Sequence, residues 1–176
     1  MIVIGVDPGA RHTGIVVVDT ARRACLDHHT LSRPSTDPML PVSTQYANDI
    51  VSMIGTLTRD PDREIRAIAV ETVTRPNWHV TSREGGGRAA ANPEALIAAA
   101  VIVGAVITLR IGVPIVQVPP GHNGSAPLAA YPDALVSDRE RAQRGWRLRV
   151  GTGTLRHARS AFDVALHAPT LLRSRP

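Results

Sequence analysis

The sequence predicts an α/β fold in which a mixed β-sheet is covered by helices on both faces. Short runs rich in β-branched residues at 2–6 and 13–18, and a third segment at 24–31, follow one another through short links, which predicts three antiparallel strands. Apolar runs at 65–70 and 115–118 alternate with helical patterns instead. That alternation is typical of parallel strands joined by crossover helices. The expected order is therefore β-β-β-α-β-α-β-α.

The helices are predicted from apolar periodicity and from their capping residues. Residues 43–57 carry apolar side chains at helical spacing behind Ser43, a favourable N-cap. Residues 92–94 read Asn-Pro-Glu, a typical helix start, and the helix predicted there runs to Leu109. It is apolar on nearly every side, which indicates a buried helix or one at a subunit interface. Two further helices are predicted at 133–143 and 156–167.

Composition indicates one globular domain over residues 1–176 with an affinity for polyanions. Hydrophobic residues make up 43% and charged residues 20% of the chain, and the formal net charge is +5. All 20 basic residues are arginine, whose planar guanidinium pairs well with phosphate. A GC-rich genome explains the absence of lysine equally well. The positive charge still favours association with nucleic acid.

Several classes of protein are disfavoured. Cys25 is the single cysteine, so the chain has no intramolecular disulfide and no cysteine-based zinc site. The N-terminus lacks a basic signal region, and the apolar run from Ala95 to Leu109 is too short to span a bilayer. We expect a cytoplasmic protein with no membrane partner and no organic cofactor.

Three acidic residues occupy positions that suit metal-ion catalysis. Asp7 ends the first strand, Glu71 ends the fourth strand, and Asp163 lies on the last helix. If the first and fourth strands are neighbours, their carboxylates converge, and such a cluster is costly without a cation. Phosphodiester hydrolysis uses two divalent ions about 4 Å apart, and oxygen ligands favour Mg²⁺ or Mn²⁺. We expect Asp7 to be the central ligand.

These motifs resemble those of one nuclease family. The stretch from Val3 to Gly14, VIGVDPGARHTG, resembles the opening motif of RuvC-type Holliday junction resolvases, which have an RNase H-like fold. The stretch from Ile68 to Glu71 resembles their second acidic strand. The stretch from Ser160 to Leu166 resembles their C-terminal acidic helix, in the form associated with actinobacteriophage RuvC-like endonucleases. The element order is also that of an RNase H-like fold.

The resemblance implies a homodimer that cleaves branched DNA with two Mg²⁺ ions, for which Mn²⁺ can substitute. Asp7, Glu71 and Asp163 would be its metal ligands. Family members carry an acid or a histidine three residues before the last acid, where this chain has Ser160. His157 is the alternative catalytic residue, although a regular helix turns it about 120° away from Asp163. Ser160 and His157 therefore both remain candidates for the fourth ligand.

Three groups of residues are predicted to contact DNA. The loop that follows Glu71 borders the expected site, and its aromatic side chain either stacks on a base or packs under the loop. The arginines of all three groups either contact phosphates or are solvated. Those at the start of the last helix are also placed to neutralise the scissile phosphate. The residues are Arg75, Trp78, Arg83 and Arg88 in the loop, Arg144 and Arg147 further on, and Arg156 and Arg159 on the helix.

Three other functions are compatible with parts of the sequence. An actin-like or hexokinase-like ATPase shares the Asp-x-Gly hairpin, but it needs two such domains and an adenosine-binding motif that this chain lacks. A protein of the same fold that binds structured nucleic acid with little or no cleavage remains open because of Ser160. An RNase H-like RNA-processing nuclease is the third alternative. The sequence does not distinguish four-way junctions from flaps or forks.

Overall fold

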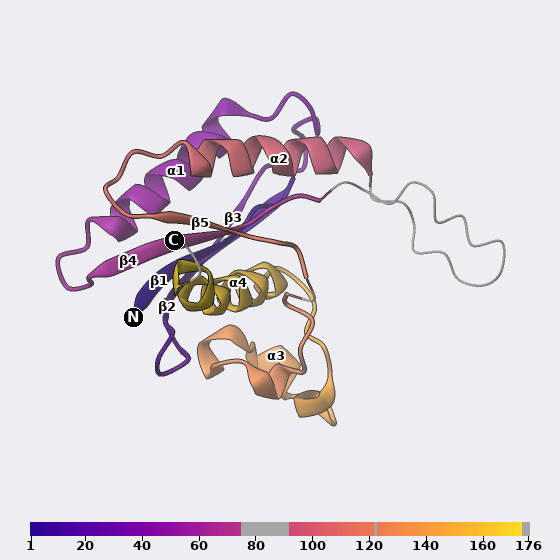
Figure 1. The fold of residues 1–176 in the computed structure, drawn as a ribbon. Coiled ribbons are helices and arrows are strands. Elements are labelled where there is room, and N and C mark those ends of the chain that lie inside the picture. Colours follow the sequence, from indigo (N-terminus) through magenta and orange to yellow (C-terminus); the bar gives the residue numbers. More distant parts are fainter. Residues whose placement is uncertain (75–91, 122, 174–176) are drawn as a thin grey trace.

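The computed structural model describes residues 1–74, 92–121 and 123–173. In these residues the core element is a mixed sheet of five strands in the order β3-β2-β1-β4-β5 (Figure 1). The strands are β1 (Ile2–Asp7), β2 (His12–Asp19), β3 (Ala24–Ser32), β4 (Ile65–Glu71) and β5 (Ile115–Val118).

Strand pairing follows the predicted pattern. β1 and β3 both pair antiparallel with β2, whereas β1 pairs parallel with β4 and β4 pairs parallel with β5. The parallel register aligns Val6 with Val70, so Asp7 and Glu71 each follow a paired residue at the same edge of the sheet. The prediction of a mixed α/β sheet is confirmed, and the sheet brings the two acidic strand ends together.

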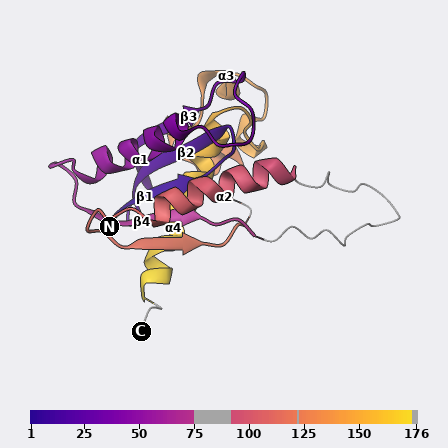
Figure 2. The same cartoon turned by 90° about the horizontal axis from the view of Figure 1, so that it is seen from above.

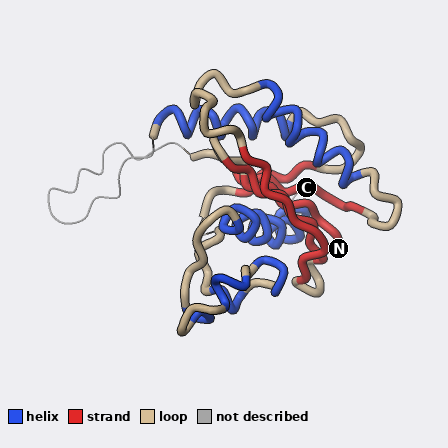
Figure 3. The backbone as a smooth tube through the Cα atoms, turned by 180° about the vertical axis from the view of Figure 1, so that it is seen from behind, coloured by secondary structure: helices blue, strands red, loops and turns tan. Residues whose placement is uncertain are grey.

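Helices cover both faces of the sheet (Figures 1 and 3). α1 (Thr44–Thr58) and α2 (Pro93–Ile107) pack on one face, where they meet Ile4, Val6 and other inward side chains. Figure 2 shows these two helices crossing the same face of the sheet. α4 (Leu155–Arg173) packs on the opposite face, with α3 (Asp138–Arg141) outside it. Alternate residues of β1, β2 and β4 therefore belong to two separate cores.

The backbone of α4 lies unusually close to β1. A Cβ at Gly5 would overlap the carbonyl group of Ala161, so only glycine permits this approach. The close contact brings the first turns of α4 beside the end of β1. This packing decides which helix residues can reach Asp7.

Two predicted helices differ from those observed. The helix expected at 133–143 is broken into a 3-10 turn at Asp133–Leu135 and the single turn of α3, because Val136 is extended and Ser137 caps a new start. α4 continues beyond the expected end at residue 167 to Arg173, since Ala168 is still buried in the core. None of the helices within the described ranges is long and apolar enough to cross a membrane.

Candidate active site

Asp7 and Glu71 form the centre of the candidate site. Burial, followed by a hydrogen bond with the neighbouring Asp7 carboxyl group and the like charge of Asp7, raises the pKa of Glu71 from 4.5 to about 7. Two carboxylates in this position are costly when both are ionised and unpaired. The arrangement therefore favours a proton or a cation between the two side chains.

The Glu71 carboxylate is oriented by two further groups. Asn123 Nδ2 donates a hydrogen bond of 2.8 Å to Oε1, and Ser160 Oγ donates one of 3.4 Å to Oε2. Asn123 follows β5 and Ser160 lies on α4, so Glu71 is held from both sides. Sequence reasoning missed Asn123 because its contact with Glu71 joins residues 52 positions apart.

His157 lies directly against Asp7. Its Nδ1 is 2.8 Å from Asp7 Oδ2, and its side chain is 29% exposed against 15% for Asp7. α4 begins at Leu155, so His157 occupies a regular helix turn and still reaches the site. His157 therefore pairs with Asp7 and not with Asp163, which lies on a different side of α4.

A second histidine, which the sequence did not single out, borders this pair. The ring of His12 lies 5.6 Å from that of His157, centroid to centroid, and its Nδ1 is 2.8 Å from Ser32 Oγ. Burial, then the positive field of His157 and Arg11, lowers the pKa of His12. His12 is therefore a mainly neutral neighbour of the site at pH 7.

Asp163 is held at the other edge of the site by the loop that follows β5. Its Oδ2 accepts hydrogen bonds of 2.8 Å from both the Gly124 backbone N–H and the Tyr131 hydroxyl. Gly124 has φ +70°, and a Cβ there would crowd the backbone of Ser160, so glycine lets the loop reach the helix. Burial and the Asp163 carboxylate raise the pKa of Tyr131, which keeps its hydroxyl a donor.

The turn after Asp7 is fixed by a small hydrogen-bond network. The Tyr46 hydroxyl on α1 donates to the Gly9 carbonyl at 3.1 Å and lies 2.8 Å from Thr13 Oγ1. Thr13 Oγ1 also accepts from the Gly9 N–H at 3.3 Å. The network limits the freedom of the chain beside Asp7.

The donor set fits a divalent cation of the Mg²⁺ or Mn²⁺ kind. Asp7 and Glu71 offer hard oxygen ligands, and their mutual repulsion, visible in the raised pKa of Glu71, is what a cation relieves. Across residues 1–74, 92–121 and 123–173, no three His, Cys, Asp or Glu side chains are already gathered as a metal site. Asp163 is engaged with Tyr131 instead of with the other two acids.

An apolar cavity of about 310 Å³ opens beside Glu71. Pro8 and Pro120 line it from the two loops that flank the site, and Leu96 and Val103 line it from α2. Such walls suit the face of a sugar or a base better than they suit a phosphate.

The predicted DNA-contacting residues have different environments. Arg144, Arg147 and Arg156 are exposed, as a phosphate contact requires. Arg159 is fully buried, and its guanidinium bonds to Glu140 at 3.1 Å and to the Leu135 carbonyl at 2.8 Å. The prediction that Arg159 contacts DNA is therefore wrong, because its charge is already paired inside the protein. The remaining predicted contacts, Arg75, Trp78, Arg83 and Arg88, lie outside the described residues.

Comparison with known proteins identifies the fold. No protein-family model and no curated protein matches the chain by sequence. The structure is similar to Thermus thermophilus RuvC in complex with Holliday junction substrate, with a TM-score of 0.57 and 18% identity over 98% of this chain and 95% of that one. A second Thermus thermophilus RuvC structure gives a TM-score of 0.56 and 19% identity over 98% and 96%. The chain therefore has the RuvC-type, RNase H-like fold that its motifs predicted.

Proposed function

We propose that this chain is a divalent-metal-dependent endonuclease that cleaves branched DNA, such as Holliday junctions and related forks or flaps. The observation that carries the proposal is the pair of strand-end carboxylates, Asp7 and Glu71, on a fold shared with RuvC. Branched DNA is the substrate class because one similar structure is of RuvC with a Holliday junction. The net charge of +5 supports a polyanionic substrate.

In this proposal Asp7 and Glu71 hold Mg²⁺ or Mn²⁺, with Asp163 completing a two-ion site. The bound ions would supply charge stabilisation for the attacking water and the leaving oxygen. His157 orients Asp7 through Nδ1 and can accept or donate a proton at its other ring nitrogen. Ser160 and Asn123 keep Glu71 turned toward Asp7.

The proposed assembly is a homodimer formed through α2. This helix buries one side against the sheet and leaves Ile97 51% and Val101 46% exposed on the other. An exposed aliphatic stripe on a regular helix supports a partner surface. Two sites related by a two-fold axis would allow symmetric cleavage of a four-way junction.

Cleavage of defined substrates tests the proposal directly. A labelled four-way DNA junction, a linear duplex and an RNA hairpin are each incubated with the chain and Mg²⁺ or Mn²⁺. We expect incision of the junction near its branch point, and Asp7→Asn lowers the rate by at least about a thousandfold, since it removes a ligand charge at the reacting phosphate. Asp49→Asn, an exposed acid on α1, is the matched control and leaves the rate unchanged.

The same experiment separates the alternatives. Junction binding without incision, equal in the wild type and Asp7→Asn, identifies a structure-specific binding protein and contradicts the nuclease proposal. Preferential cutting of the RNA hairpin identifies an RNA-processing nuclease instead.

A further inference from the structure

Residues 144–149, here named the arginine tip, combine an exposed leucine with unpaired positive charge. Leu148 is 85% exposed, a larger fraction than any other large hydrophobic residue in the described part of the chain. Arg144, Arg147 and Arg149 form no ion pair with any described residue, and Arg147 instead lies 5.3 Å over the ring of Trp146. Arg149 donates a hydrogen bond of 2.7 Å to Gln143 Oε1, a neutral partner that leaves its charge uncompensated. A leucine flanked by these guanidinium groups suits a partner whose surface is anionic and whose interior is apolar.

The arginine tip is braced against the body of the protein. Trp146 packs against the core on the α4 side of the sheet, which turns Leu148 outward on a single 3-10 turn. The Leu128 N–H donates to the Arg149 carbonyl at 2.8 Å, and Val150 pairs with Pro127 in a β-bridge. These contacts hold both ends of the turn, so Leu148 has a defined position.

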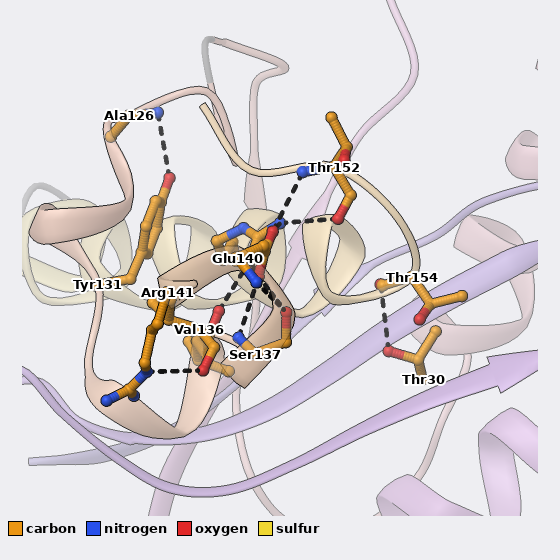
Figure 4. A network of polar contacts seen from close by, with 11 residues as sticks. Thr30, Ala126, Tyr131, Val136, Ser137, Glu140, Arg141, Thr152 and Thr154 are labelled. Carbon is orange, nitrogen blue, oxygen red and sulfur yellow. Dashed lines mark hydrogen bonds and ion pairs between the residues drawn. The ribbon is translucent and has the colours of Figure 1, made fainter. Parts of the chain in front are cut away.

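A buried ion pair clamps the chain on either side of the arginine tip (Figure 4). Glu140, just before it, accepts hydrogen bonds from the Ser137 N–H at 3.0 Å and from the Thr152 N–H, just after it, at 3.2 Å. The same carboxylate binds Arg159 on α4, 3.1 Å away. Burial opposes ionisation, yet these hydrogen bonds lower the pKa of Glu140, so the pair is charged.

The Glu140–Arg159 ion pair connects the arginine tip to the candidate active site through α4. Arg159 lies two residues after His157 on α4, so the anchor of the tip and the partner of Asp7 share one helix. A buried ion pair contributes little net stability compared with apolar packing, and its main effect here is to select one geometry. The tip is thereby held in a fixed relation to His157.

We propose that the arginine tip is a wedge for DNA: Leu148 inserts between bases at the branch point while the flanking arginines bind the phosphates on either side. Apolar wedges between base steps are paired with basic side chains in proteins that kink DNA. An open branch point exposes unstacked base faces that a regular duplex does not. The inference rests on the proposed function for its substrate, and it names Leu148 as the residue that recognises the branch.

Binding of the full chain is measured in EDTA, which prevents cleavage. The probes are a four-way junction with 2-aminopurine at the branch point and a linear duplex of the same sequence. We expect Leu148→Ala to weaken junction binding about tenfold, because a buried leucine contact is lost, and to remove the rise in 2-aminopurine fluorescence. Linear duplex binding changes less than twofold. Leu26→Ala, a substitution of a leucine 41% exposed on β3, is the matched control and behaves as wild type.

The arginines give a separate signature. Arg147→Gln weakens binding to both probes and lowers the slope of log K against log salt by about 1, whereas Leu148→Ala leaves that slope unchanged.

The possible outcomes separate the wedge from the proposed function. If the wild type binds neither probe, the proposed function fails and the wedge fails with it. If the wild type binds the junction and Leu148→Ala binds it equally well with the same fluorescence, the wedge alone is overturned. The wedge is also overturned if Leu148→Ala keeps junction binding but loses binding to phosphatidylserine vesicles, or changes from dimer to monomer in gel filtration.

Discussion

Glu71→Gln should make the metal-free protein more stable at alkaline pH while it removes catalytic function. The carboxylate of Glu71 faces that of Asp7, and burial together with this repulsion raises the pKa of Glu71 to about 7. A glutamine keeps the oxygen that accepts from Asn123 and can donate its amide N–H to Asp7. The substitution therefore replaces a repulsion with a hydrogen bond.

The size of the effect follows from the pKa of Glu71. Between pH 4.5 and about 7 the folded chain holds a proton that the unfolded chain has released, so stability falls as pH rises through this window. The full shift corresponds to about 3 kcal/mol. Glu71 is partly exposed and solvent screens part of the repulsion, so we expect about 1–2 kcal/mol. Glutamine does not titrate, and the variant escapes this loss.

Urea unfolding in EDTA at pH 5 and pH 8 measures the difference. We expect the two proteins to be similar at pH 5 and Glu71→Gln to gain about 1–2 kcal/mol relative to the wild type by pH 8. Glu64→Gln, an exposed acid just before β4, shows no such pH-dependent gain. Mg²⁺ should stabilise the wild type more than the variant at pH 8. An equal difference between wild type and Glu71→Gln at both pH values would refute the reasoning.

Three further substitutions probe the packing around the site. Arg159→Met should cost about 3–5 kcal/mol in urea unfolding, because Glu140 is left buried and unpaired, and replacing both residues by apolar ones should recover most of it; no recovery in the double variant would contradict this. Tyr131→Phe removes a donor to Asp163 and should cost about 1 kcal/mol of stability. In isothermal calorimetry it should also weaken Mn²⁺ binding severalfold, and unchanged Mn²⁺ affinity would show that Asp163 needs no such positioning. Gly5→Ala should cost about 1–3 kcal/mol in thermal unfolding, since its Cβ overlaps the backbone of α4, and wild-type stability would be incompatible with that packing.

The strands were predictable because their signals are local. Val3 and Ile4 belong to a β-branched run whose two faces are both buried, and such a run is recognisable without knowledge of its neighbours. The N-caps at Ser43 and Asn92 were equally local, and both accept the expected backbone hydrogen bonds. The break at Val136 was not predictable in this way, since the buried ion pair beyond it favours a separate single-turn helix.

The residues of the candidate site also divide into those that local sequence predicts and those that it does not. Asp7 and Glu71 could be named from the sequence because each ends an apolar strand, and a charge in that position is costly unless it is paired. The role of Arg159 could not be read correctly, because its position near other arginines favours a surface, and only the fold buries it against Glu140. Tyr131 gave no signal, since its partner Asp163 is 32 residues away.

The sequence by itself determined the order of strands and helices, the two acidic strand ends and the positive charge, because these follow from local periodicity and composition. Only the tertiary structure decided which side chains meet. The approach of α4 to Gly5 sets the rotation of that helix. As a result, His157 contacts Asp7, and Asp163 accepts a hydrogen bond from Tyr131. Contacts between residues far apart in sequence depend on such packing, and no spacing within one segment encodes them.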